Sequence, residues 1–214
     1  MIKAVIFDMD GTLIDTERQL FQSWLEAAKI LGLDGFREEH ALMLRSLASK
    51  FAEPMLKDIF GEDFPYRELR QKRRECMEKR IQKYGIEKKA GVDELLCFLK
   101  EKGYKTAVAT ASDYERASSY LGQVGLLDSF DQIICATQME NGKPYPDVYL
   151  YACEQLGELP EECLAVEDAP NGVMAAYRAG TKVVMIPDLT LPDQELEKML
   201  YQKAESLKDL IKMF

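Results

Sequence analysis

Two pairs of acidic residues in this 214-residue chain stand directly after short apolar runs. Asp8 and Asp10 follow the run Ala4–Phe7, and the pair Glu167-Asp168 follows the run Cys163–Val166. If these runs are neighbouring strands, four carboxylates meet in a partly desolvated cleft, where like charges resist ionisation. A hard cation resolves this conflict, and a few carboxylates plus water favour Mg²⁺, whose remaining positions are commonly filled by substrate phosphate oxygens. The acidic pairs therefore predict a Mg²⁺ site that handles a phosphoryl group.

Hydroxyl groups and a lysine stand at comparable positions. Thr110 ends the run Lys105–Thr110, Ala111 and Ser112 follow it, and Lys143 lies in a loop before a predicted helix. Opposite the metal, hydroxyls, an ammonium group and loop amides would neutralise the other oxygens of a phosphoryl group. Simpler explanations stay open at this point: Lys143 as a solvated loop lysine, and Ser112 as the N-cap of the next helix. Taken with the acidic pairs, these residues predict phosphoryl transfer.

The elements that must position these side chains alternate between strand and helix. Apolar runs rich in β-branched residues predict strands covered on both faces over Ala4–Phe7, Lys105–Thr110, Gln132–Ala136, Cys163–Val166 and Thr181–Ile186. Segments of helical period that end at glycines predict helices over Val92–Lys102, Tyr114–Val124, Pro146–Leu156 and Asn171–Ala179. This alternation indicates an α/β protein with a doubly wound parallel sheet, a Rossmann-like core. In such sheets the ligand site lies outside the carboxyl ends of the strands, where the residues above stand.

The chain between the first two strands breaks the alternation. From about Thr16 to Tyr84 it has no strand-like run, and helical patterns cover Thr16–Leu31, Glu38–Ser49, Phe51–Phe60 and Tyr66–Tyr84. An all-helical block cannot join the sheet without disturbing its winding. We therefore expect a helical domain over residues 16–87, inserted into a core made of residues 1–15 and 88–214.

Composition and charge exclude several other classes of protein. The chain is 47% hydrophobic and 30% charged, like an ordinary soluble globular protein, and no apolar run approaches the ~20 residues that span a bilayer. The net charge, 28 basic minus 37 acidic residues, is −9, which disfavours a nucleic-acid or anionic-membrane surface. The five cysteines lack the close-paired spacing of a disulfide framework or a zinc site. We expect a cytoplasmic monomer or weak dimer whose partner is a small phosphorylated metabolite.

Taken in order along the chain, the motifs resemble those of one superfamily. Asp8-Met9-Asp10-Gly11-Thr12 after an apolar strand, followed by Thr110, Lys143-Pro144 and Glu167-Asp168, looks like the four motifs of the haloacid dehalogenase superfamily, in its branch of phosphatases and β-phosphoglucomutases. The match covers nearly the whole chain. The helical insertion after the first motif resembles the mobile cap of this branch.

The resemblance implies a role for each motif residue. Asp8 is then the nucleophile that forms an aspartyl-phosphate, and Asp10 protonates the leaving oxygen before it deprotonates the incoming water or hydroxyl. By the same resemblance, Mg²⁺ is held by Asp8, by Asp168 and by the backbone carbonyl of Asp10, with Glu167 in support. The substrate contacts that it implies come from Thr110, Ala111, Ser112, Lys143 and, in the cap, Arg45.

One departure from the family pattern bears on the reaction. The β-phosphoglucomutases carry a histidine four residues after the threonine that here is Thr16, and this chain has Leu20 at that position. Leucine cannot hydrogen-bond the acid/base residue. We therefore expect hydrolysis of a sugar phosphate, with a hexose-phosphate mutase as the alternative.

Two further questions stay open from the sequence. A noncatalytic receiver-like phospho-acceptor module also places paired aspartates at a strand end and binds Mg²⁺, although receivers are shorter and lack a helical insertion. In the predicted cap, Gln71–Arg74 is the densest part of a basic stretch. Such a run is usually a solvated helix face, but Lys72 or Arg73 can instead face the cleft and meet a second anionic group of the substrate.

Overall fold

A computed structural model describes residues 1–214 and contains one parallel sheet in the strand order β3-β2-β1-β4-β5-β6. The strands are short, and the apolar residues of the first five are largely buried because helices cover both faces of the sheet. The doubly wound parallel fold expected from the sequence is confirmed. The strands are β1 (Ala4–Phe7), β2 (Lys105–Thr110), β3 (Gln132–Cys135), β4 (Cys163–Glu167), β5 (Lys182–Met185) and β6 (Gln202–Lys203).

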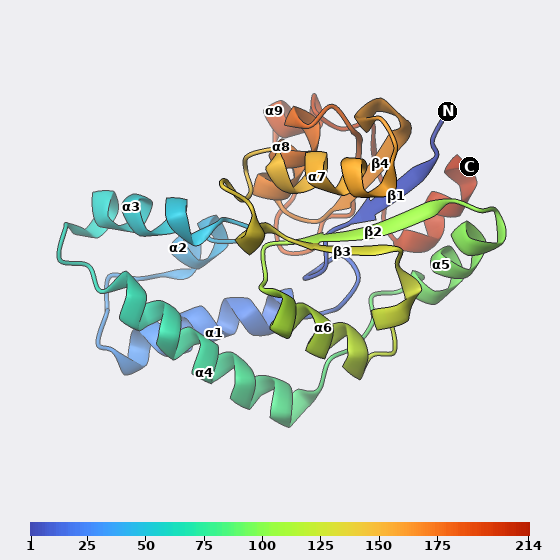
Figure 1. Ribbon diagram of the computed structural model, residues 1–214. Coiled ribbons are helices and arrows are strands. Elements are labelled where there is room, and N and C mark those ends of the chain that lie inside the picture. The colour runs from blue at the N-terminus through green and yellow to red at the C-terminus, as the bar shows by residue number, and fades with distance from the viewer.

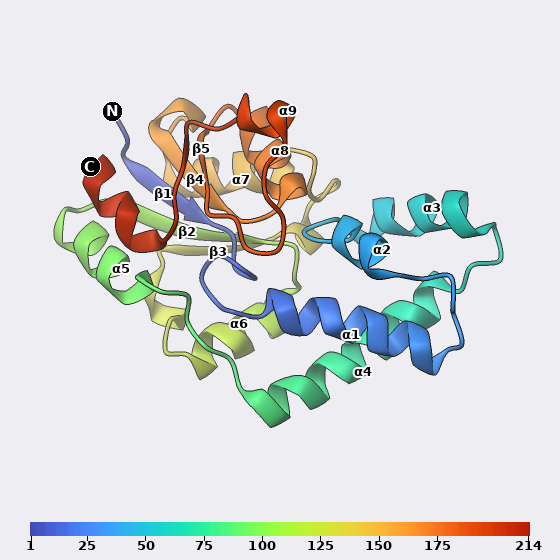
Figure 2. The same ribbon diagram turned by 180° about the vertical axis from the view of Figure 1, so that it is seen from behind.

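The two faces of the sheet carry separate hydrophobic clusters, since alternate strand residues point to opposite sides. Val5 and Phe7 of β1 pack with helices α5 (Val92–Glu101) and α6 (Tyr114–Gln123). Ala4 and Ile6 pack with helices on the other face: α7 (Asp147–Leu156), α8 (Pro170–Arg178) and α9 (Gln194–Glu197). Figures 1 and 2 show α5 and α6 on one side of the sheet and α7 and α8 on the other.

Four helices between β1 and β2 form a block beside the sheet (Figure 1). They share an apolar cluster of their own, which includes Trp24, Leu56 and Leu69. The longest two, α1 and α4, pack side by side along most of their length in both views (Figures 1 and 2). We call this block the cap; its helices are α1 (Glu17–Ile30), α2 (Glu38–Met43), α3 (Ser49–Phe60) and α4 (Tyr66–Tyr84).

The structure corrects one predicted helix. The helix expected over Glu38–Ser49 ends at Met43, and a loop follows in which Ser46 has a φ of 53°, a left-handed conformation that interrupts a helix. In this loop the carbonyl of Arg45 accepts a hydrogen bond from the Asn171 side chain (2.8 Å). The helical pattern of the sequence continues past Met43, but in the structure the segment that carries Arg45 contacts the core instead of extending the helix. The four-residue α9 and the two-residue β6 were also not predicted.

The cap touches the core at the loop that carries Lys143. The amide of Ala48 donates to the carbonyl of Lys143 (3.0 Å), and the rings of Phe51 and Tyr145 stack with centroids 4.9 Å apart. A β-carbon added to Gly142 would lie 2.7 Å from the methyl group of Ala48.

No helix of the chain has the length and the apolar character needed to cross a membrane.

Candidate active site

Lys143 links the carboxylates of two strands at the edge of the sheet. In the register, Phe7 lies beside Val166 of β4, which brings the next residues, Asp8 and Glu167, to the same level. The Lys143 ammonium donates to Asp8 (2.5 Å), to Glu167 (2.6 Å) and to the Ala109 carbonyl (2.9 Å), and its side chain is fully buried. Burial opposes the charge of Lys143, but the two carboxylates raise its pKa. Lys143 is therefore not a solvated loop residue, and we call Asp8, Lys143 and Glu167 the core wall.

Glu167 is held in place from several directions. Its Oε1 atom accepts a hydrogen bond from the Tyr149 hydroxyl (2.6 Å) as well as from Lys143. Helix α8 passes so close that a β-carbon on Gly172 would overlap the Glu167 carboxylate, which leaves room for no residue but glycine. Neither Glu167 nor Asp168 caps α8, whose N-cap is Ala169.

Three of the predicted metal ligands lie together. One carboxylate oxygen each from Asp8, Glu167 and Asp168 falls within 4.8 Å of the others, and Asp8 Oδ2 and Asp168 Oδ1 are buried without a hydrogen-bond partner. Burial raises the pKa of Asp8 and that of Asp168 well above the ordinary range. A divalent cation would satisfy both oxygens and favour the charged carboxylates, so the donor set fits Mg²⁺.

The Asp10 side chain lies apart from this acidic cluster. Its Oδ1 atom accepts hydrogen bonds from the Thr16 hydroxyl and from Arg116 (2.8 Å), and its Oδ2 atom accepts one from the Ser112 hydroxyl (3.3 Å). The family resemblance implies that only the backbone carbonyl of Asp10 contacts the metal, and these side-chain contacts are compatible with that prediction.

Thr110, Ala111 and Ser112 line a small cavity over Asp8, of about 80 Å³. Thr110 ends β2, and its hydroxyl accepts a hydrogen bond from the Ser112 amide (3.1 Å). The N-cap of α6 is Asp113, whose carboxylate accepts from the Arg116 amide (3.0 Å). The suggestion that Ser112 caps this helix is therefore wrong, and its hydroxyl faces Asp10 instead.

Arg45 does not line this cavity, although the family resemblance implied a substrate contact. Its buried guanidinium pairs with Asp168 and with Glu17 (2.8 Å), and it donates to the Thr190 hydroxyl (2.9 Å). Glu17 is itself buried, and burial raises its pKa to about 7 against the opposing effect of Arg45. Arg45 thus ties the cap to the acidic cluster, and its predicted contact with substrate stays a prediction.

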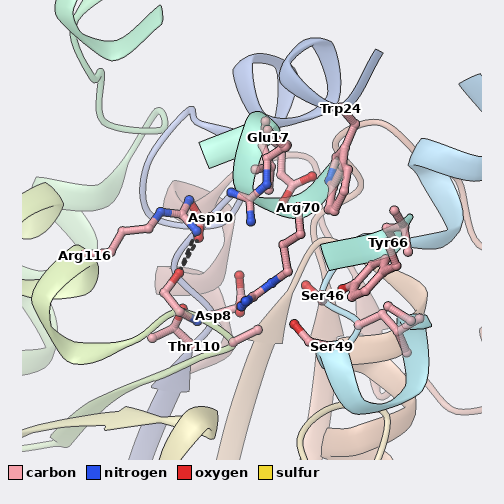
Figure 3. A pocket seen from close by; sticks show the side chains of 17 residues that line it. Asp8, Asp10, Glu17, Trp24, Ser46, Ser49, Tyr66, Arg70, Thr110 and Arg116 are labelled. Carbon is pink, nitrogen blue, oxygen red and sulfur yellow. Dashed lines mark hydrogen bonds and ion pairs between the residues drawn. The ribbon is translucent and has the colours of Figure 1, made fainter. Parts of the chain in front are cut away.

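The cap closes the cavity with arginines that lack an acidic partner. Arg73 is 8% exposed and lies over the Trp24 ring (5.1 Å), and its Nε atom is buried without a hydrogen bond. Burial and the neighbouring arginines lower the pKa of Arg73 to about 9. Arg70 extends from α4 toward Asp8 (Figure 3). We call Arg70 and Arg73 the cap wall.

The cap wall also borders a second, larger cavity of about 390 Å³, which lies between α4 and α6. Lys72 lines neither cavity and pairs with Glu75 (2.7 Å) on the outside of the helix. Of the two residues considered in the basic stretch, Arg73 is the one that faces the cleft.

Several site residues were not singled out from the sequence. Arg70, Arg116 and Glu17 line the cavity over Asp8, and Tyr149 supports Glu167 from α7. Arg116 stands four residues after Ser112, one helical turn, which is the signal that could have placed it beside the motif. The others lie on helix faces whose rotation toward the site depends on packing with distant segments.

Comparison with known proteins agrees with this geometry. The family model of the haloacid dehalogenase-like hydrolases matches residues 5–186. YhcW of Bacillus subtilis (strain 168) is 36% identical over 96% of this chain and 94% of its own length. The phosphorylated carbohydrates phosphatase of Thermotoga maritima is 34% identical over 84% of this chain and 82% of its own.

Solved structures support the same relationship. The crystal structure of CbbY from Rhodobacter sphaeroides in complex with phosphate is 26% identical and superposes with a TM-score of 0.80, over 98% of this chain and 96% of that one. The matched residues run from β1, just before the first motif, through β5. The chain belongs to the haloacid dehalogenase-like hydrolases and is an enzyme of that family.

Proposed function

We propose that the protein is a Mg²⁺-dependent phosphatase that hydrolyses a small phosphorylated metabolite, a sugar phosphate, through an Asp8 aspartyl-phosphate. The observation that carries the proposal is the arrangement at Asp8: one carboxylate oxygen is paired with Lys143, and the other is buried, unpartnered and beside Asp168. A carboxylate held in this way is oriented for attack and has one oxygen left for bond formation.

The reaction follows in two balanced steps. A carboxylate oxygen of Asp8 attacks phosphorus, the bond from phosphorus to the ester oxygen breaks, and a protonated Asp10 gives its proton to that oxygen to form an alcohol. Water then attacks the aspartyl-phosphate and gives a proton to Asp10, and the bond from phosphorus to Asp8 breaks to release phosphate. Asp8 and Asp10 both return to their starting states.

The other residues of the cavity stabilise charge and exclude water. The Lys143 ammonium and the Thr110 hydroxyl oppose the negative charge that builds on the phosphoryl oxygens. When bound by Asp8 and Asp168, with Glu167 in support, Mg²⁺ would supply further neutralisation of that charge. We propose that the cap, residues 16–87, opens to admit substrate and closes to remove solvent from the cavity.

The substrate class is supported by the cavity and by the relatives. The cap wall offers cationic groups without acidic partners, which suits a phosphorylated compound, and a relative bears the name phosphorylated carbohydrates phosphatase. The net charge of −9 fits an enzyme with no nucleic-acid or membrane partner, and we propose a cytoplasmic monomer or weak dimer.

Leu20 bears on the choice between hydrolysis and a mutase reaction. It lines the cavity over Asp8, where its apolar side chain can neither donate to Asp10 nor help to activate a sugar hydroxyl. This observation favours water as the acceptor. A mutase would convert β-glucose 1-phosphate to the 6-phosphate, in the presence of a bisphosphate primer, faster than it releases phosphate.

The test is phosphate release from a panel of sugar phosphates with Mg²⁺, by wild type and by Asp8→Asn. We expect turnover in wild type and none above background in Asp8→Asn. Asp34→Asn, at an exposed position of the cap, serves as the matched control and should retain wild-type turnover. Full activity of Asp8→Asn would refute the nucleophile, and preferential mutase activity would refute hydrolysis.

A further inference from the structure

Arg116 makes a fixed contact with the side chain of Asp10. Its Nη2 atom donates to Asp10 Oδ1 (2.8 Å), and its Nη1 atom donates to the Ser112 hydroxyl (2.8 Å), which in turn donates to Asp10 Oδ2 (3.3 Å). The guanidinium also lies over the Tyr120 ring, 4.9 Å from its centroid. Figure 3 shows Arg116 and Asp10 together on one side of the cavity. Arg116 is thus held by Tyr120 on its own helix and by Ser112 at the end of β2.

Arg116 contacts Asp10 from the core and not from the cap. Thr16, the other donor to Asp10 Oδ1, stands at the start of the first cap helix, whereas Arg116 and Ser112 belong to the core side of the cavity. A cap that opens can carry Thr16 away, but it leaves the pair of Arg116 and Asp10 intact. The position of Asp10 is then set by the core through both stages of a catalytic cycle.

The ion pair with Arg116 restricts the orientation of the Asp10 side chain. A charge-assisted hydrogen bond is directional, so it fixes the carboxylate that accepts it. In the second step of the proposed reaction this carboxylate takes a proton from water. No other cation is paired with Asp10.

We propose that Arg116 is the positioning residue of Asp10: from the core side it holds the carboxylate in a fixed orientation toward the reacting centre. This inference rests on the proposed function, since it assigns Arg116 an effect that passes only through Asp10. A residue that acted on the substrate directly would have an effect independent of Asp10.

A double-mutant cycle measures this dependence. Turnover of p-nitrophenyl phosphate with Mg²⁺ is compared for wild type, Arg116→Met, Asp10→Asn and the double variant. The nitrophenolate leaves without protonation, so Asp10→Asn should retain a measurable rate. We expect Arg116→Met to lower kcat roughly 10- to 100-fold, within the range of acid–base effects, with a much smaller change in KM. In the Asp10→Asn background the same change should cost less than about threefold.

Two further variants separate positioning from general damage to the fold. Arg116→Lys keeps a donor and a charge near Asp10 and should recover part of the lost kcat. Arg67→Met removes an exposed arginine from α4 and should leave kcat unchanged. Circular dichroism and melting temperatures establish that each variant is folded, and Arg116→Lys carries the test if Arg116→Met does not fold.

The outcomes distinguish this inference from the proposed function. If Asp10→Asn has wild-type kcat, the acid/base role of Asp10 is refuted. If Asp10→Asn is impaired but Arg116→Met and Arg116→Lys are not, Arg116 does not position Asp10. An undiminished loss from Arg116→Met in the Asp10→Asn background, or a loss in KM alone, shows that Arg116 acts on substrate or fold directly and also overturns the inference.

Discussion

The two walls of the cavity differ in how their charges are balanced. In the core wall, one buried ammonium group lies between two buried carboxylates, so every charge has an opposite partner. In the cap wall, Arg73 is also buried but has no carboxylate partner, and the charged groups near it are other arginines. Each charge of the core wall thus has a partner within the protein, and only one oxygen of Asp8 is left for a metal ion or substrate, whereas the cap wall has no internal partner for its charge.

This difference separates the tasks of the two walls. In the proposed reaction the core wall places Asp8 for attack, and a buried ion pair resists displacement because either charge alone is costly in that environment. The proposed role of the cap wall is to bind an anionic group of the substrate, and an unpartnered guanidinium gains most from a new hydrogen bond. Removal of the Lys143 charge from the core wall should therefore lower the stability of the fold, whereas removal of the Arg73 charge from the cap wall should raise it.

Among the variants of the core wall, Lys143→Met should have the largest effect on stability and activity. It leaves Asp8 and Glu167 buried without their common partner, and we expect the free energy of unfolding to fall by about 3–5 kcal/mol. Phosphatase activity should be lost. Chemical denaturation and phosphate release measure the two effects, with Lys100→Met, at an exposed site, as the control. Wild-type stability in Lys143→Met would contradict the charge balance described for this wall.

Gly172→Ala tests the same wall through its support. The new methyl group would overlap the Glu167 carboxylate and push it away from Lys143 and Tyr149. We expect a loss of about 1–3 kcal/mol in unfolding free energy and roughly 10²-fold in kcat/KM. The control is Gly122→Ala, a helical glycine with open space around it, which should be neutral or stabilising. Equal behaviour of the two variants would refute the steric argument.

Arg73→Met tests the cap wall. Substrate should lose a charge-assisted hydrogen bond, so KM for a sugar phosphate rises roughly 10-fold, while kcat changes little. Stability should rise by roughly 1 kcal/mol, because an unpaired buried charge is removed and the lost contact with Trp24 offsets only part of that gain. Steady-state kinetics and denaturation report both quantities. A fall in stability as large as that of Lys143→Met would erase the contrast between the walls.

Glu17→Gln extends the comparison of the two walls to the contact between the cap and the core. Burial raises the pKa of Glu17 to about 7, above its ordinary value of 4.5, so the folded protein holds a proton that the unfolded chain releases between about pH 5 and 7. Stability from this group is therefore greatest below that window and declines as pH rises through it. Glu17→Gln has no carboxyl group to titrate at this position, so its stability should decline less as pH rises.

Melting temperatures between pH 5 and 8, in buffer with a chelator, measure this effect. We expect the difference between the variant and wild type across the window to be roughly 2–3 kcal/mol, or about 5–10 °C. Glu68→Gln, at an exposed position of α4, should follow the wild-type profile. Parallel profiles for wild type and Glu17→Gln would show that Glu17 does not titrate in this range.

The sequence predicted the core side of the site well for a physical reason. Asp8, Thr110 and Glu167 each stand at the end of an apolar run, and parallel strand order alone brings such ends to one edge of a sheet. No knowledge of side-chain packing is needed for that step. The metal and substrate roles of these residues, and the boundaries at residues 15 and 87, stay predictions.

The orientation of the side chains on the cap side could not be predicted from the helical periodicity of the sequence. Lys72 and Arg73 are neighbours in sequence, yet one helix rotation of about 100° separates a solvated lysine from a buried arginine. Arg45 was expected in a helix, but its segment follows the contact with Asn171. Arg116 lay in a correctly predicted helix, and only the fold shows that this face of α6 turns toward Asp10.

The close approach of Gly142 to Ala48 has a mechanical consequence for cap closure. The loop and the cap can come this close only because position 142 has no side chain, so the contact between them depends on glycine. In the proposed cycle of opening and closing, a larger residue at position 142 would hold the cap away from the core and leave Asp8, Asp10 and Lys143 themselves unchanged. Gly142 would then affect how completely the cap closes without taking part in the reaction.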